Sequence, residues 1–316
     1  MSESSAPSRG LSVTALYPAG FVPRMRVYLG EMFPVPLRLL TAVLLYASLA
    51  RVLARLHRWP MAVTFTELLL GAGSAFATML LLRLMDELKD RDVDRQLFAA
   101  RPLPSGRVRE SDIRLALWLG SGLFVAAHAG QELSLWTALG VLAYAGLMFH
   151  WFFVPGLMRP RLLLTLLTHN PVIPVLLLHL VVIAAGARGR GLRDLEVAAL
   201  LPLVLVYWAP VLAWEIARKI RAAEEENAYV TYSRLLGAWG AVAVVTAAQT
   251  LALGLILRLG YVHGLQAAWG VCAGVGWAVA QAAHVRFLLR PDATSSRLRP
   301  FAELFLLAVL LGGLLA

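Results

Sequence analysis

The sequence predicts an all-α integral membrane protein, a bundle of about nine transmembrane helices. The 316-residue chain is 59% hydrophobic and only 15% charged, and its mean hydropathy is +0.70. Soluble domains are about 45–50% apolar and about 25% charged. The apolar stretches have the length of a membrane-spanning helix, and none alternates with the period of two that transmembrane strands require. These observations together exclude a soluble domain and a β-barrel.

The predicted spans follow one another from residue 36 to the last residue. They cover residues 36–56, 61–85, 112–130, 133–154, 162–187, 195–215, 234–258, 264–288 and 299–316. The third and the last are short or contain glycine. Residues 1–35 contain several prolines and lack the uninterrupted apolar core of a signal peptide. We therefore expect a cytoplasmic N-terminal segment, 1–35, followed by a single transmembrane domain, 36–316.

The basic residues predict how the chain is oriented. Nine spans put the two termini on opposite sides, and 22 of the 29 lysines and arginines then lie on the N-terminal side. The positive-inside rule makes that side cytoplasmic. A formal net charge of +10 is common in nucleic-acid-binding proteins, but this chain has almost no soluble part to carry such a site. We expect the lipid bilayer as a partner and no nucleic acid. The one cysteine, Cys272, excludes an intrachain disulfide.

Acidic residues gather directly after the second and the sixth span. Five of the 19 lie within Asp86–Asp94, and the second cluster consists of Glu215, Glu224, Glu225 and Glu226. The two clusters begin about 129 residues apart. Two four-helix pseudo-repeats plus one further helix would produce this spacing, and functional sites of membrane proteins often lie where such repeats meet.

The first acidic cluster predicts a metal site. Asp86, Asp90 and Asp94 are spaced i, i+4 and i+8, so on one helix they drift by only about 40° per step and form a single stripe. Carboxylates this close repel one another unless a cation lies among them. Hard oxygen ligands suit Mg²⁺ that also contacts phosphate oxygens. The alternative is a solvated helix end whose acids pair with Lys89, Arg91 and Arg95.

The stripe and the loop after it, Arg101–Gly106, resemble the UbiA superfamily of intramembrane prenyltransferases. The first motif of that family, Asn-Asp-x-x-Asp-x-x-x-Asp, lies at the cytoplasmic end of helix 2 and is followed by Arg-Pro-Leu-Pro-Ser-Gly. Here Asp86 stands at the asparagine position and Glu87 at the aspartate after it, while Asp90 and Asp94 match directly. The resemblance implies a nine-helix bundle with an acid-lined cytoplasmic mouth.

The second acidic cluster departs from the family pattern, which has Asp-x-x-x-Asp after helix 6. Glu215 takes the first place and Lys219 the second. Either Glu224 replaces the missing ligand, or Lys219 contacts the diphosphate directly and one metal is bound less tightly. Of the family's Tyr-x-x-x-Lys-Arg element after helix 4, only Arg159 carries over.

The resemblance implies an enzyme that uses Mg²⁺ to ionise a polyprenyl diphosphate, transfers the prenyl group to an acceptor such as an aromatic ring, and releases diphosphate. The implied metal ligands are Asp86, Glu87, Asp90, Asp94, Glu215 and Glu224. The implied catalytic residues among them are Asp90, Asp94 and Glu215. The implied diphosphate-binding residues are Arg101, Arg107, Arg159, Arg218, Lys219 and Arg221.

Three other functions stay open. A UbiA-type terpene cyclase would perform the same ionisation but cyclise the prenyl cation without an acceptor. A transporter would place its charges at the bilayer midplane, whereas these charges cluster at one face. A non-catalytic family member is the third alternative, because Lys219 replaces an acid.

Several aromatic and polar residues are candidates for the wall of the pocket. Aromatic faces stabilise cations, although aromatic side chains of membrane proteins are more often packing residues or interface anchors. The aromatic candidates are Trp151, Tyr207, Trp208 and Trp214. His169 and Asn170 lie inside the fifth span, where polar side chains are costly unless they face a cavity or a partner. They would orient an acceptor or take up the final proton, or else form hydrogen bonds between helices around a proline kink.

Overall fold

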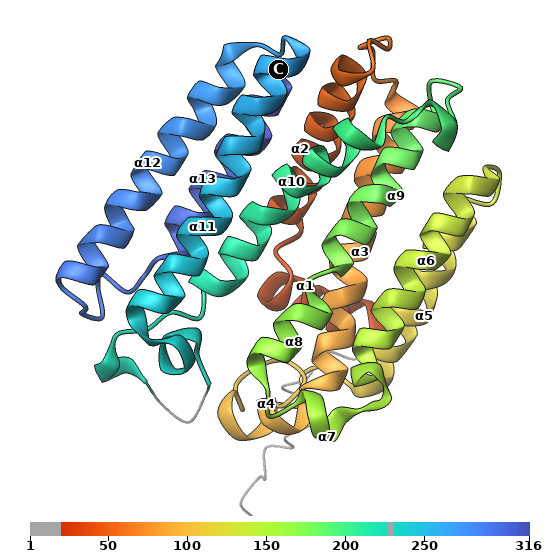
Figure 1. Cartoon of the computed structure of the whole chain (residues 1–316). Helices are drawn as coiled ribbons and strands as arrows, with labels where there is room; N and C mark the ends of the chain where they lie inside the picture. The colour runs from red at the N-terminus through yellow and green to blue at the C-terminus, as the bar shows by residue number, and fades with distance from the viewer. Residues whose placement is uncertain (1–19, 227–229) are drawn as a thin grey trace, which may run out of the picture.

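The structure, a computed structural model, describes residues 20–226 and 230–316 (Figure 1). These residues form helices and connections without any strand, which confirms the predicted all-α class. The predicted N-terminal segment lies largely outside the described residues. Its described part contains the short helix α1 (Phe21–Met32), which ends shortly before Pro34.

Each predicted span contains a helix. The long helices are α2 (Val35–Leu56), α3 (Phe65–Lys89), α5 (Glu110–Ala126), α6 (Glu132–Phe149), α9 (Val172–Gly186), α10 (Val197–Ala217), α11 (Tyr232–His263), α12 (Ala267–Leu289) and α13 (Arg299–Leu314). The short helices are α4 (Arg91–Leu97), α7 (Pro155–Met158) and α8 (Leu162–His169). Asn170 and Pro171 separate α8 from α9, as the proline in the fifth span predicts.

Seven helical segments of the described chain are long and apolar enough to cross a membrane, with α8 and α9 counted as one segment. The predicted count of nine is therefore not confirmed, because α5 and α13 contain only 17 and 16 residues. A helix of 17 residues is about 26 Å long, somewhat less than the bilayer core of about 30 Å. Large apolar side chains on the outside, such as Trp118 at 77% exposure and Phe65 at 79%, face lipid. The chain is an integral, multi-pass membrane protein.

The helices run side by side, and their ends form two faces (Figure 1). The C-terminal end of α3 lies at the same end of the bundle as α4, α7 and the connection from α10 to α11, whereas the C-terminus lies at the opposite end. We call the first of these the acidic end, because it carries Asp86, Asp90 and Glu215. α3 packs against α2, α5 and α9, and α10 packs against α11 and α13. The two pseudo-repeats stay a prediction.

A buried ion pair fastens α3 at the opposite end of the bundle. Arg188, just after α9, contacts Glu67 in the first turn of α3 at 2.7 Å, and the two side chains are only 4% and 2% exposed. The hydroxyl of Tyr46 on α2 donates a second hydrogen bond to Glu67 at 3.0 Å. A buried carboxylate is tolerated where a cation and hydrogen-bond donors compensate it. This contact joins three helices and fixes the position of α3.

Candidate active site

The segment from Asp86 to Asp94 is divided between two helices. α3 ends at Lys89, and Asp90 joins it to α4 with a φ of −98° and a ψ of 6°, a conformation that interrupts a helix. Asp86 therefore lies in the last turn of α3, whereas Asp94 lies on α4. The predicted single stripe of three carboxylates is wrong for this reason. Asp86 and Asp90 are exposed, and Asp94 is buried.

Asp86 and Asp90 are the open carboxylates of this segment. Neither side chain has a hydrogen bond or an ion pair within the described residues. Although the Asp90 side chain is exposed, burial by the surrounding protein raises the pKa of its carboxyl above the ordinary range, against the opposing effect of Lys89. The two carboxylates thus have no direct ion pair, while the positive charges of Lys89 and Arg83 act on both of them electrostatically.

Glu87 and Asp94 are buried and already paired. Glu87 contacts Arg83 at 2.6 Å, and its second oxygen, Oε1, is buried without a hydrogen-bond partner. Asp94 receives two hydrogen bonds of 2.8 Å from one nitrogen of Arg101. Because their charges are compensated, these two acids contribute less to a cation site than the sequence motif implies.

The Arg101–Gly106 loop is held by Arg101 and by Arg107, the residue that follows it. Arg101 stacks on Phe98, with 3.8 Å between the guanidinium carbon and the ring centre, while it binds Asp94. Arg107 donates to the carbonyl of Ala100 at 2.7 Å and forms a two-pronged ion pair with Glu31 of α1. Both guanidinium groups therefore shape the loop. Their predicted role in diphosphate binding stays a prediction.

The second acidic cluster faces the first across the acidic end. Glu215, near the end of α10, contacts Arg218 at 2.6 Å and Lys219 at 3.2 Å. Asp86 and Glu215 repel each other electrostatically, and Lys219 attracts Asp90. The structure thus brings together the two motifs that the sequence separates, and Lys219, while it contacts Glu215, lies close enough to act electrostatically on Asp90.

Glu224 and Arg221 have other neighbours. Glu224 accepts a hydrogen bond of 3.0 Å from the backbone of Ala293, in the connection between α12 and α13. Arg221 donates to the carbonyl of Glu225 at 3.3 Å. No hydrogen bond or ion pair joins the Glu224 side chain to Asp86 or Asp90 in the described residues. The predicted replacement of the missing metal ligand by Glu224 therefore gains no support, and the role of Arg221 stays a prediction.

Lys89 is a site residue that the sequence reasoning treated only as a partner for acids. Its ammonium lies 2.6 Å from Nε2 of His169 and 3.7 Å from the ring centre of Trp151. Because an ammonium can only donate, Nε2 of His169 accepts, and the neutral ring carries its proton on Nδ1. The lone pair that would take up a final proton is thus engaged. This contact joins residues 80 positions apart, so local sequence carries no signal for it.

The other predicted pocket residues are spread over the bundle. The indole of Trp208 donates a hydrogen bond to Asn170 at the break between α8 and α9. Tyr207 is fully buried and lies 2.6 Å from the hydroxyl of Ser48, which places it in the core. Trp214 donates to Glu303 of α13 at 3.0 Å. Of these, Asn170 and Trp208 lie at the helix break next to His169.

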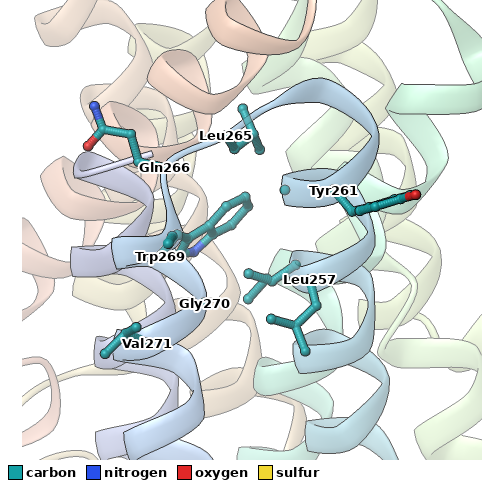
Figure 2. Close-up of a pocket in the computed structure, with 10 residues that line it drawn as sticks. Leu257, Tyr261, Leu265, Gln266, Trp269, Gly270 and Val271 are labelled. Atoms are coloured by element: carbon teal, nitrogen blue, oxygen red, sulfur yellow. The ribbon is translucent and has the colours of Figure 1, made fainter.

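A separate pocket of about 490 Å³ opens between α11 and α12 at the end opposite the acids (Figure 2). Trp269 and Leu257 face each other across it, and its lining is largely apolar. Tyr261 at its edge is 92% exposed, as expected for a side chain in contact with lipid. None of the predicted site residues lines this pocket.

Two solved structures share this architecture. One is the apo structure of a UbiA homolog from Aeropyrum pernix K1, with a TM-score of 0.63 and 22% identity, covering 86% of this chain and 94% of that chain. The chain has the UbiA fold. The other is a digeranylgeranylglyceryl phosphate synthase, with a TM-score of 0.61 and 16% identity, covering 93% of this chain and 99% of that chain. No protein-family model and no curated protein matches the chain.

At the acidic end of this UbiA fold, Asp86 and Asp90 are the carboxylates that would be available to hold a Mg²⁺ ion. The described residues contain no group of three or more His, Cys, Asp or Glu arranged for a metal. Phosphate-handling Mg²⁺ sites, however, usually use one or two carboxylates and complete the shell with water and phosphate oxygens. Asp86 and Asp90 meet this requirement, whereas Glu87, Asp94 and Glu215 already form ion pairs.

Proposed function

We propose that this protein is an intramembrane prenyltransferase that ionises a polyprenyl diphosphate with Mg²⁺ and transfers the prenyl group to an acceptor. The observation that carries the proposal is the pair of open carboxylates, Asp86 and Asp90, at one end of a bundle with the UbiA fold. The two structural relatives support the same reaction class, since one is a UbiA homolog and the other a digeranylgeranylglyceryl phosphate synthase.

In the proposed reaction, Asp86 and Asp90 hold the metal ion and Lys219 binds the diphosphate beside it. Bound Mg²⁺ supplies neutralisation of the negative charge that develops on the leaving diphosphate. The apolar helices hold the prenyl chain and exclude water, so that water does not capture the allylic cation. The ring of Trp151 holds the ammonium of Lys89 near the mouth, because an aromatic face attracts cations. An acceptor such as an aromatic ring then forms a bond to the allylic carbon, whose C–O bond to diphosphate has broken, and the proton that the ring loses passes to the released diphosphate.

Diphosphate release from defined substrates tests this function. The protein, reconstituted in lipid nanodiscs, is incubated with farnesyl or geranylgeranyl diphosphate and Mg²⁺. We expect Asp90→Asn to lower the rate about 100-fold or more, because loss of a metal ligand removes several kcal/mol of stabilisation from the transition state. Asp92→Asn is the matched control, since Asp92 is 76% exposed and has only contacts of 3.7 Å to two arginines.

The outcomes separate the alternatives. Full activity of the Asp90→Asn variant contradicts the assignment of Asp90, and equal losses in both variants contradict a specific metal site. The same incubation without an acceptor distinguishes the cyclase. A cyclic hydrocarbon or alcohol released under those conditions replaces the transferase proposal with a UbiA-type terpene cyclase.

A further inference from the structure

The groove between α11 and α12 opens toward lipid at the end of the bundle opposite the acids (Figure 2). Its volume of about 490 Å³ lies within the range of small-molecule pockets, about 300–1,000 Å³. Leu257, Val271 and Tyr261 at its edge are 55%, 63% and 92% exposed. On two helices long and apolar enough to cross a membrane, such side chains contact the hydrocarbon of the bilayer. A lipid is therefore the molecule that the surroundings offer to this groove.

Two glycines and a tryptophan shape the groove. Nothing lies within 4 Å of a Cβ built at Gly260, so a side chain at this position would extend into open space. At Gly270 a Cβ would lie only 3.0 Å from the side chain of Leu257, so glycine lets the two helices face each other closely below the opening. The indole N–H of Trp269 donates to the carbonyl of Val309 on α13 at 3.0 Å, which leaves only apolar ring atoms for an occupant. The groove thus suits a hydrocarbon chain.

Apolar contacts alone do not make such a groove selective. Lipid tails are as apolar as the side chains that line it, so a tail gains no hydrophobic free energy when it enters from the bilayer. Selectivity among lipids must come from a charged group near the opening, where the headgroup lies.

Arg258 supplies a positive charge beside the opening. It follows Leu257 directly and lies one turn before Tyr261 on α11, so its long side chain flanks the groove. This side chain is exposed and has neither a hydrogen bond nor an ion pair within the described residues. Glu196 lines a neighbouring hollow together with Arg258, but no ion pair joins the two. An arginine in a membrane-spanning helix is costly without a counter-charge, and a phosphate group matches its guanidinium.

We propose that this groove binds an anionic phospholipid of the surrounding bilayer. One acyl chain lies between α11 and α12 against Trp269, and the headgroup phosphate contacts Arg258, whose side chain extends toward the interface. The bound lipid fills the space between the two helices near their connection and holds them together there. The proposal does not depend on the reaction at the acidic end.

Native mass spectrometry with added lipids tests the headgroup contact. The protein in detergent is titrated with phosphatidylglycerol or phosphatidylcholine of identical acyl chains, and the affinity for the first bound lipid is measured. We expect the wild type to bind phosphatidylglycerol about tenfold or more tightly, because choline offsets the phosphate charge in the other lipid. Arg258→Gln should lose this preference. Arg55→Gln is the matched control, since Arg55 is an exposed arginine near the end of α2 on the same side of the bundle.

A second pair of variants tests the position of the acyl chain. Gly260→Leu places a side chain in the groove, so both lipids should bind about tenfold or more weakly. Gly254→Leu is the control, because Gly254 lies on the same helix, also has nothing within 4 Å of a Cβ, and does not line the groove.

Three results overturn the proposal: equal affinities of the wild type for the two lipids, a preference that survives in Arg258→Gln, or undiminished binding by Gly260→Leu. Displacement of the lipid by geranylgeranyl diphosphate would assign the groove to a prenyl chain instead. A dimer that Gly260→Leu disrupts would assign it to a second copy of the chain. Either outcome also overturns the proposal. Arg258 is exposed, so its variant remains informative if Gly260→Leu does not fold.

Discussion

Asp90 combines an accessible side chain with a carboxyl whose charge the surrounding protein disfavours. Burial raises its pKa, and the nearby Asp94 adds to the shift, while Lys89 opposes it. A cation that binds Asp90 relieves this penalty, because it replaces lost hydration with a direct electrostatic contact. If Asp90 holds the metal as proposed, the same carboxyl links the pH to the metal affinity.

We expect Mg²⁺ affinity to be complete above the raised pKa of Asp90 and to fall as the pH decreases through it. A proton and Mg²⁺ compete for the same oxygens, so the loss should begin above the ordinary aspartate pKa of about 3.9. Calorimetric titration with Mg²⁺ at a series of pH values measures this. Asp90→Asn should lower the affinity for Mg²⁺ and remove most of its dependence on pH. An affinity that stays constant down to the ordinary aspartate range contradicts the prediction.

At the scale of helices, the position of the site depends on how α3 packs. Gly71 lies where α3 meets α2, and a Cβ at this position would overlap the ring of Tyr46. Tyr46 in turn donates to the buried Glu67. A larger residue at Gly71 must displace the ring, the hydrogen bond or the whole helix. Close packing of α2 against α3 therefore fixes the position of Asp86 and Asp90 along the axis of the bundle.

Gly71→Ala should destabilise the protein by about 1–3 kcal/mol, the usual cost of overpacking. Gly73→Ala is the matched control, since nothing lies within 4 Å of a Cβ at Gly73 on the same helix. Thermal unfolding of both variants in one detergent measures the difference. Similar midpoints for Gly71→Ala and the wild type would show that α2 and α3 are packed less closely than the structure indicates.

At the scale of the whole molecule, the distribution of basic residues predicts that the acidic end is cytoplasmic. In a background with Cys272→Ser, a membrane-impermeant maleimide applied to intact cells should label Arg190→Cys and spare Asp92→Cys. A membrane-permeant maleimide should label both. Gln131→Cys, between α5 and α6, should label like Arg190→Cys if the short helix α5 crosses the membrane. The reverse pattern for Asp92 and Arg190 contradicts the orientation, and protection of Gln131 contradicts a crossing by α5.

Much of the fold could be predicted, because lipid imposes length and apolarity on each span. The break at Asn170–Pro171 could also be predicted, since proline removes a backbone donor. The end of α3 at Asp90 could not, because Lys89–Asp92 contains neither glycine nor proline. The spacing of the aspartates therefore suggested one helix where the structure has two. Contacts such as Lys89 with His169 depend on packing between distant segments, which local patterns do not encode.

The contact of Lys89 with His169 has a consequence for the energetics of catalysis. Water around a free ammonium must reorient whenever a neighbouring charge changes, and this reorganisation adds to an activation barrier. An imidazole and an indole that hold the ammonium in place are oriented once, during folding. In the proposed reaction, negative charge that moves onto the departing diphosphate would be met by an ammonium that is already oriented, without further solvent rearrangement. The oriented ammonium would then stabilise the transition state with an electrostatic field that exists before the substrate binds.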